Sequence, residues 1–287
     1  MTYSILAHDE TTGALGIAVQ SKFPGVSTLI CHGAAKVGVI ATQAFSNPDH
    51  GARGLELLRL GVAPETTLDI LLDGDENKAE RQLAILTPEG SARFTGEEVR
   101  GWAGFAGALE GNSCLAHGNG LAGPQVLQAM VDGFAKTDGD FATRLIAALS
   151  SGEAAGGELR GVQSAGLQIF QDGAGYGGRQ QMLVDISIYD HADPIAELSR
   201  CYGLHRLSYF PSEEQNLVPV DAETAAYLTK ILVDEGYLTG TPAPDWDADK
   251  IAAFARFMGR ENYDNRIRED ALIDLEVLAD IRAKRSD

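Results

Sequence analysis

Polar residues interrupt several apolar stretches of this sequence, and together they are more polar than a plain protein core requires. In the first 50 residues they are Ser21, Lys22, Lys36, Thr42, Gln43 and Asn47. Further along they are Arg81, Gln82, Asn119, Arg160, Gln163 and Ser164, the last three among the glycines of AAGGELRGVQSAG. Glycine permits unusual backbone dihedrals or the close approach of another group. The pattern indicates a polar site built from separate segments.

Each of these residues also has a structural interpretation, which the sequence leaves open. A lysine between Ala35 and Val37 can lay its stem on apolar surface at a strand end and keep its amine in water. Thr42 and Gln43 can be core groups that a neighbouring strand satisfies. Strand parity places Lys36 and Thr42 on one face.

Motifs for a cofactor or a metal are weaker. Gly173, Gly175 and Gly178 in GAGYGG have the spacing of a dinucleotide fingerprint, but that motif needs a following helix, and here a strand follows. We therefore predict a loop and no cofactor. The six histidines form no HxxxH or HxH pair, so no metal site is predicted. Cys31 and His32 are consecutive in a predicted strand and point to opposite faces, which favours a structural cysteine.

Charge and composition restrict the partners. The chain of 287 residues has a formal net charge of -18, and a field of that sign repels phosphate backbones and anionic lipids. We expect no nucleic-acid partner. Cys31, Cys114 and Cys201 are widely separated, which fits reduced thiols in the cytoplasm. No apolar run approaches the ~20 residues of a membrane helix and no signal-peptide pattern is visible, so no membrane association is predicted.

Hydrophobic periodicity predicts the elements that position the polar residues. Strands are predicted over 3–8, 15–21, 27–31, 37–44, 81–86, 92–95, 162–171 and 182–189. Helices are predicted over 52–60, 65–72, 124–135 and 141–149. Leu15, Ile17 and Val19 share one strand face, and Gly16 and Ala18 on the other are small, so both faces look buried. This order predicts an α+β sandwich with helices over packed sheets.

The pattern changes near residue 211. From Asp221 onward only helical periods occur, over 224–236, 248–258 and 266–282, with a break at TPAPDW. We predict a first domain over residues 1–212 and a small all-α module over residues 213–287.

Several blocks, in order, carry a resemblance to a known family. They are MTYSILAHD, GIAVQSKFPGV, ATQAFSNPDHGARGLELL, the RQ of ERQLAIL, TGEEVRGWAG, GNGLAG and AAGGELRGVQSAGL. Over roughly residues 1 to 210 the chain resembles the DUF1028 family, which is similar in fold to the N-terminal-nucleophile (Ntn) hydrolases. The resemblance implies a four-layer αββα sandwich. The tail, especially GRENYDNRIREDALIDLEVLADIR, is similar to a peptidoglycan-binding module.

In Ntn hydrolases the side chain of the first mature residue attacks an amide carbonyl, and its own α-amine is the base. The resemblance therefore implies that Thr2 is the nucleophile after removal of Met1. Lys36 and Lys22 are candidates for a lysine beside it, Ser21 is counted with them, and Thr42, Gln43 or Asn47 could donate to the oxyanion. Substrate contacts are assigned to Asn47, Arg81, Gln82, Asn119, Arg160, Gln163 and Ser164.

We expect the polar residues of the first 50 positions to converge on one cleft near Thr2. The expected ligand of the first domain is a small or peptide-like amide. The tail is expected to act inside the cell, either by packing on the sandwich or by binding a soluble peptidoglycan fragment. By analogy with relatives of this fold, we expect a homo-oligomer. The alternative is the same fold without the chemistry, in a ligand-binding or scaffolding role, because a fold does not imply a function.

Overall fold

The structure is a computed structural model, and it describes residues 1–285. The chain forms two compact units, Met1–Tyr202 and Gly203–Asp287. This division lies within the helix α7 (Pro194–Tyr209), before the boundary at residue 212 that the sequence pattern predicts.

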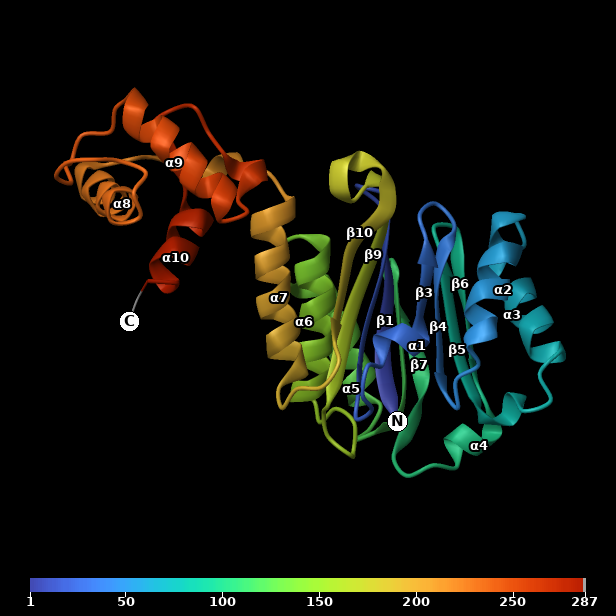
Figure 1. Cartoon of the computed structure of the whole chain (residues 1–287). Helices are drawn as coiled ribbons and strands as arrows, with labels where there is room; N and C mark the ends of the chain where they lie inside the picture. Colours follow the sequence, from blue (N-terminus) through green and yellow to red (C-terminus); the bar gives the residue numbers. More distant parts are fainter. Residues whose placement is uncertain (286–287) are drawn as a thin grey trace. The chain divides into compact units, whose positions relative to one another are not determined.

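Two antiparallel sheets form the centre of the first unit (Figure 1). The six-stranded sheet has the order β10 (Gln180–Ile188), β9 (Ser164–Ala174), β2 (Ala14–Ser21), β1 (Thr2–Asp9), β8 (Cys114–Leu121) and β7 (Phe105–Gly111). The four-stranded sheet has the order β3 (Cys31–Ala34), β4 (Gly38–Ala44), β5 (Arg81–Thr87) and β6 (Gly90–Thr95).

Helices cover the outer face of each sheet. The pair α5 (Gln125–Lys136) and α6 (Phe141–Ala154) packs on the larger sheet, and the pair α2 (Pro48–Arg59) and α3 (Pro64–Asp73) packs on the smaller one (Figure 1). The short helices are α1 (Ser27–Ile30), α4 (Glu97–Arg100), and the 3-10 turns η1 (Lys78–Glu80) and η2 (Tyr176–Gly178). The predicted four-layer αββα sandwich is confirmed.

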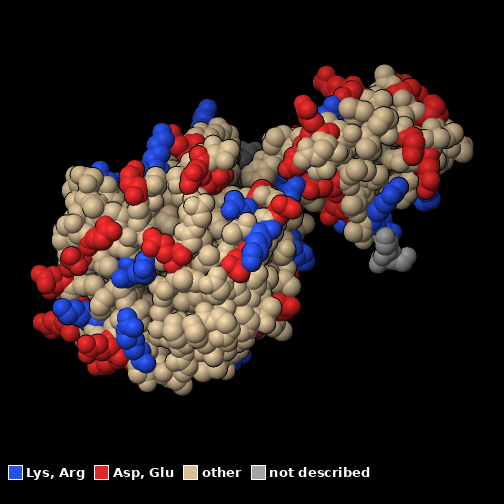
Figure 2. Space-filling model, turned by 180° about the vertical axis from the view of Figure 1, so that it is seen from behind, with Lys and Arg blue, Asp and Glu red and all other residues tan. Residues whose placement is uncertain are grey.

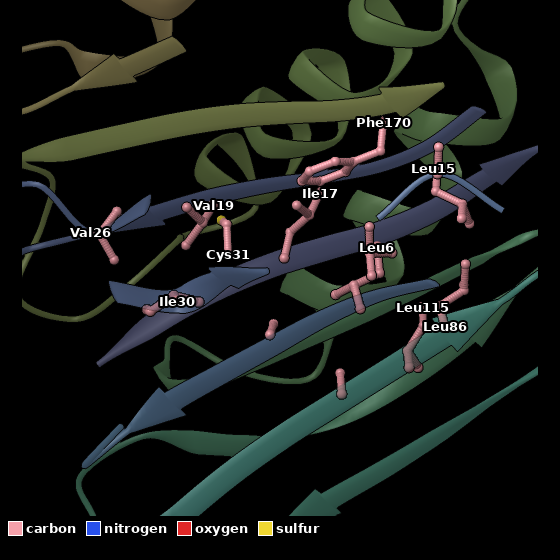
Figure 3. Packing of buried hydrophobic residues seen from close by; sticks show 14 residues of the cluster. Leu6, Leu15, Ile17, Val19, Val26, Ile30, Cys31, Leu86, Leu115 and Phe170 are labelled. Atoms are coloured by element: carbon pink, nitrogen blue, oxygen red, sulfur yellow. The ribbon is translucent and has the colours of Figure 1, made fainter. Parts of the chain in front are cut away.

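The core between the two sheets follows the predicted strand parity. Leu15, Ile17 and Val19 of β2 pack with Leu6 of β1 and with apolar residues of the opposite sheet (Figure 3). On the other face of β2, a Cβ on Gly16 would come within 2.5 Å of Leu145 in α6. The small residues of β2 therefore allow a helix to approach that face closely.

Several elements differ from the sequence prediction. The predicted strand over 27–31 is instead the single turn α1 followed by β3, because the chain crosses there from the larger sheet to the smaller one. Strands β7 and β8 were not predicted, since FAGALEG and CLAHGNGL are rich in glycine and alanine, which have low strand propensity. The segment with Gly173, Gly175 and Gly178 connects β9 to β10 as predicted.

The second unit holds the helices α8 (Ala222–Asp234), α9 (Ala248–Arg260) and α10 (Leu275–Ala283). It also has the strand pair β11 (Leu217–Pro219) and β12 (Leu272–Asp274), and the turns η3 (Glu214–Asn216) and η4 (Asp264–Arg266). The predicted helix over 266–282 begins only at Leu275. Within the predicted span, Arg266 instead ends η4 and Leu272–Asp274 pair with β11, and the buried Arg266 guanidinium is 2.7 Å from Asp274.

Charges of both signs are distributed over the visible face of both units (Figure 2). Among residues 1–285, no helix combines the length and the apolar composition needed to cross a bilayer.

Candidate functional site

Thr2 is the first residue of β1, and this strand lies in the interior of the six-stranded sheet. It pairs with Ser21 at the end of β2 on one side and with Asn119 of β8 on the other. The Thr2 hydroxyl Oγ1 is 3.0 Å from Ser21 Oγ. Pairing on both sides fixes the Thr2 backbone, so its hydroxyl has a defined position.

The carbonyl oxygen of Met1 accepts three hydrogen bonds. Thr2 Oγ1 donates at 2.6 Å, Ser21 Oγ at 2.8 Å, and Arg160 Nη2 at 2.7 Å. Each hydroxyl has one proton, so when both donate to the Met1 carbonyl the 3.0 Å contact between Thr2 Oγ1 and Ser21 Oγ has no proton of its own. An amide carbonyl beside the Thr2 hydroxyl is thus held by a hydroxyl and a guanidinium.

Glu158 fixes the guanidinium in place. Its buried carboxylate accepts the backbone N–H of Lys22 at 2.9 Å and the Nε–H of Arg160 at 2.5 Å. Arg160 then uses Nη2 for the carbonyl of Met1. A charged, partly buried hydrogen bond of this kind is stronger than a neutral one.

The α-amine at this site has an unusual proton affinity. Burial lowers the pKa of the Met1 amine from 8.0 to about 6, with Glu158 acting to raise it and Arg160 to lower it further. Near neutral pH the amine is therefore mostly uncharged, which is the form that can accept a proton.

A cavity of about 710 Å³ opens beside Thr2. Its lining consists of Met1, Thr2, Ser21, Phe23, Val26, Leu29, Ile30, Ala44, Phe45, Ser46, Pro48, Asn77, Glu80, Arg81, Trp102 and Arg160. Most of these side chains are apolar. The cavity is formed by the start of β1, by the ends of β2 and β4 with the segments that follow these two strands, and by residues before or at the start of β5, β7 and β9.

A buried amide network connects the two sheets behind Thr2. Gln43 Nε2 donates to Gln82 Oε1 at 2.7 Å and, at 3.5 Å, to the carbonyl of Thr2. Ser4 Oγ donates to Gln43 Oε1, and Asn119 Nδ2 donates to Gln82 Oε1. Gln82 Nε2 donates to the Gly118 carbonyl at 2.8 Å. The network thus ties the backbone at the start of β1 to the opposite sheet.

Comparison with known proteins gives the family. Residues 2–198 match the model described as "Family of unknown function (DUF1028)". The chain belongs to this family. A DUF1028 protein of Silicibacter pomeroyi, known from its crystal structure, is 33% identical, with a TM-score of 0.65, over 71% of this chain and 86% of that one. Residues 209–280 match a model described as "Putative peptidoglycan binding domain".

A more distant structural match is BPH of Thiobacillus denitrificans in complex with epoxomicin. It is 14% identical, with a TM-score of 0.32, over 60% of this chain and 98% of that one. This similarity is too low to establish a common fold. None of the curated proteins matches the chain.

The two lysines that we expected beside Thr2 in this DUF1028 chain do not lie there. Lys36 is in the turn between β3 and β4, its side chain is 72% exposed, and it pairs with Asp172. The prediction that it shares a strand face with Thr42 is wrong, because it lies outside β4. Lys22 is exposed, and its Nζ donates to the Val162 carbonyl at 3.1 Å. Among the residues described as lining the cavity, the basic side chains are Arg81 and Arg160.

Other predicted residues have contacts that stabilise the fold. Thr42 Oγ1 is 3.3 Å from the backbone of Asn47, whose side chain caps α2 by accepting from the Asp49 N–H. Ser164 Oγ donates to the Phe23 carbonyl and accepts the Val26 N–H. These contacts shape the segment that forms the cavity wall.

The remaining predicted residues divide between the cavity and its surroundings. Arg81 lines the cavity, with Nε 2.7 Å from Asp75 and Nη1 2.7 Å from the Phe45 carbonyl. Gln163 is bonded to Asp190 outside the cavity. Gln82 and Asn119 are buried in the amide network and do not line the cavity. Of the predicted polar set, the structure brings Ser21, Gln43 and Arg160 to Thr2.

Sequence reasoning missed the acid and the aromatic wall of the site. Glu158 precedes Arg160 in GGELRG, and a lone acid among glycines was the available signal. Phe23, Phe45 and Trp102 lie in connecting segments, where hydrophobic periodicity gives no information. Within residues 1–285 no group of three His, Cys, Asp or Glu side chains could hold a metal ion.

Proposed function

We propose that the first unit is an amide hydrolase of the N-terminal-nucleophile type, with the Thr2 hydroxyl as nucleophile once the Met1–Thr2 bond is cleaved. The supporting observation is the Met1 carbonyl, an amide carbonyl that contacts the Thr2 hydroxyl and is held by Ser21 Oγ and Arg160 Nη2. The same two donors would stabilise the negative oxygen that forms when the hydroxyl adds to a substrate carbonyl.

The chemistry needs no cofactor. Thr2 Oγ1 adds to the carbonyl carbon of the substrate, and its proton passes to the α-amine of Thr2, directly or through Ser21. The amine then protonates the leaving nitrogen, the C–N bond breaks, and an ester of Thr2 remains. Water adds to this ester and gives a proton to the amine, which returns it to Thr2 Oγ1 as the ester C–O bond breaks, and the acid and the free Thr2 hydroxyl are released.

Arg160 takes the part that the resemblance assigns to a lysine. A guanidinium stays protonated in proteins and so acts only as a fixed positive charge. In the uncleaved chain this positive charge lowers the pKa of the Met1 α-amine, and it would act in the same direction on the α-amine of Thr2 and stabilise an oxyanion. The α-amine is therefore the base, and Glu158 holds Arg160 in position.

The test compares three proteins: the unaltered chain, Thr2→Ala and Thr2→Ser. Mass spectrometry first selects protein in which the Met1–Thr2 bond is cleaved, and hydrolysis is then followed with peptidyl aminomethylcoumarin amides. Thr2→Ala should lose turnover while keeping its circular dichroism spectrum, because it removes the nucleophile. Thr2→Ser should keep part of the rate. Equal rates for Thr2→Ala and the unaltered protein would refute the proposal.

The second candidate is a ligand-binding protein without turnover. It is favoured by the positions of Lys22 and Lys36 away from Thr2, and by a cavity large enough for a small ligand. It predicts that ligand binding does not change in Thr2→Ala and that no amide is hydrolysed.

For the second unit we propose binding of a soluble peptidoglycan fragment, on the basis of the family match over residues 209–280. The cavity under Trp246 and Phe254 is only about 10 Å³, so the contact surface would be an outer face of the unit. Sedimentation with purified cell-wall material should show saturable binding. Loss of binding in a chain that lacks residues 213–287 would assign it to this unit, whereas no sedimentation would leave it a structural role.

We further propose that the chain acts as a homo-oligomer in the cytoplasm, where Cys31, Cys114 and Cys201 remain free thiols, as in the structure. A monomeric mass in analytical ultracentrifugation at micromolar protein would contradict the first part.

A further inference from the structure

We infer that the cavity beside Thr2 selects a large uncharged apolar side chain, aromatic or aliphatic, on the acyl side of the amide. This inference rests on the proposed function, because it assigns the cavity to the residue whose carbonyl Thr2 attacks. Three properties of the cavity support it: exposed apolar side chains, an aromatic wall fixed by its backbone, and arginines that already have partners.

The lining exposes apolar surface that a folded protein ordinarily buries. Phe23, Leu29 and Phe45 are 49%, 40% and 57% exposed, and all three line this cavity. A contiguous apolar patch of this kind commonly marks a binding site, whereas single exposed apolar residues do not. The volume of about 710 Å³ is also in the range of small-ligand sites.

The aromatic wall is held in place by the backbone. Ala44 has a φ of 70°, a left-handed conformation that is uncommon for a residue with a Cβ and that is enriched at functional sites. It turns the chain out of β4, so that the Phe45 ring meets Trp102 edge to face, with centroids 5.7 Å apart. The Phe45 N–H donates to the Glu80 carbonyl, and its own carbonyl accepts from Arg81. The exposed ring is therefore not a loose surface side chain.

The charges of the lining disfavour an acidic group. Arg81 is paired with Asp75, and Arg160 is paired with Glu158 and the Met1 carbonyl. Each guanidinium is thus already neutralised by a carboxylate, and after cleavage of the Met1–Thr2 bond the Arg160 Nη2 donor is assigned to the substrate oxyanion, so the wall has no excess positive charge. Glu80 adds a negative charge to the wall. A buried carboxylate without a counter-ion is costly, so the cavity excludes acidic side chains and accepts apolar ones.

Binding is tested apart from turnover, in the full-length variant Thr2→Ala combined with Trp246→Phe. The chain has two tryptophans, and this background leaves Trp102 in the cavity wall as the reporter. The probes are N-acetyl-Ala-Ala-X-amides with X as Phe, Leu, Lys or Glu, and calorimetry gives their affinities. The Phe and Leu probes should change Trp102 fluorescence and bind at least about tenfold tighter than the Glu probe.

A matched pair of exposed apolar residues provides the control. Phe45→Ser should weaken binding of the Phe probe by about tenfold. Leu60→Ser, at an 81% exposed residue that does not line the cavity, should leave it unchanged. Equal affinities for all four probes, absence of binding, or equal effects of the two substitutions would overturn the inference.

Turnover is then measured with the unaltered protein, cleaved between Met1 and Thr2, on aminomethylcoumarin amides of the same peptides. Selective binding of apolar probes without hydrolysis would refute the proposed function and leave the cavity assignment intact. Hydrolysis without a preference for Phe and Leu, or unaffected by Phe45→Ser, would refute the cavity assignment and leave the hydrolase. The two failures are therefore distinguishable.

Discussion

Replacing Gln82 by leucine should lower the free energy of unfolding of the first unit by about 4 kcal/mol. Gln82 Oε1 accepts from Gln43 Nε2 at 2.7 Å and from Asn119 Nδ2 at 2.8 Å. Leucine removes this acceptor and leaves two buried donors without it. Each orphaned donor costs about 1–3 kcal/mol, so the pair costs about 4 kcal/mol.

The assay is urea unfolding of the full-length chain, followed by a fluorescence signal that comes from the first unit. Trp102 lies in the first unit and Trp246 in the second, so fluorescence in a Trp246→Phe background reports on the first. Gln180→Leu is the matched control, because Gln180 is an exposed glutamine on the strand β10. Its free energy of unfolding should stay within about 0.5 kcal/mol of that of the parent protein, as expected for a surface substitution.

A loss below about 1 kcal/mol for Gln82→Leu would refute the reasoning, because that is the lower limit for one orphaned donor, and two are expected. In that case water or a rearranged Gln43 would satisfy the freed groups. Such a result would also make Gln82 a candidate substrate contact again, because its amide would not be needed for the stability of the fold.

Two further predictions concern acid stability and the fixed charge of the site. His117 is fully buried with no hydrogen-bond partner at either ring nitrogen, and burial lowers its pKa to about 3. In the unfolded chain the pKa of His117 is about 6.5, so below that pH the unfolded state binds a proton that the folded state does not. The contribution of neutral His117 to the free energy of unfolding is therefore complete above pH 6.5 and decreases toward pH 3. The decrease between pH 7 and pH 4 is roughly 3 kcal/mol. His117→Leu should therefore flatten the pH dependence of urea unfolding in this range, and an unchanged slope would contradict this. For the site, Arg160→Lys should lower kcat/KM for amide hydrolysis by about 10²-fold, because lysine cannot contact Glu158 and the oxyanion together; an unchanged kcat/KM with intact folding would exclude the oxyanion role.

Local pattern was sufficient for much of the fold. Alternating apolar residues in 15–21 predicted both faces of β2 correctly, because the strand period of two decides which side chains meet the core. The leucine spacing of 52–60 and 65–72 likewise predicted α2 and α3. Polar residues within apolar strands and among glycines indicated that a site would exist, and they included Ser21, Gln43 and Arg160.

Only the tertiary structure decided how the site is composed. Lys36 is closer to Thr2 in sequence than Gln43 is, yet a left-handed turn takes it to the surface and into a pair with Asp172. Arg160 is far away in sequence but reaches Met1, because the segment before β9 returns to the end of β2. Spacing along the chain determines which face of one element a side chain occupies. Which charge meets Thr2 depends on how strands from distant parts of the chain pair, and no local pattern contains that information.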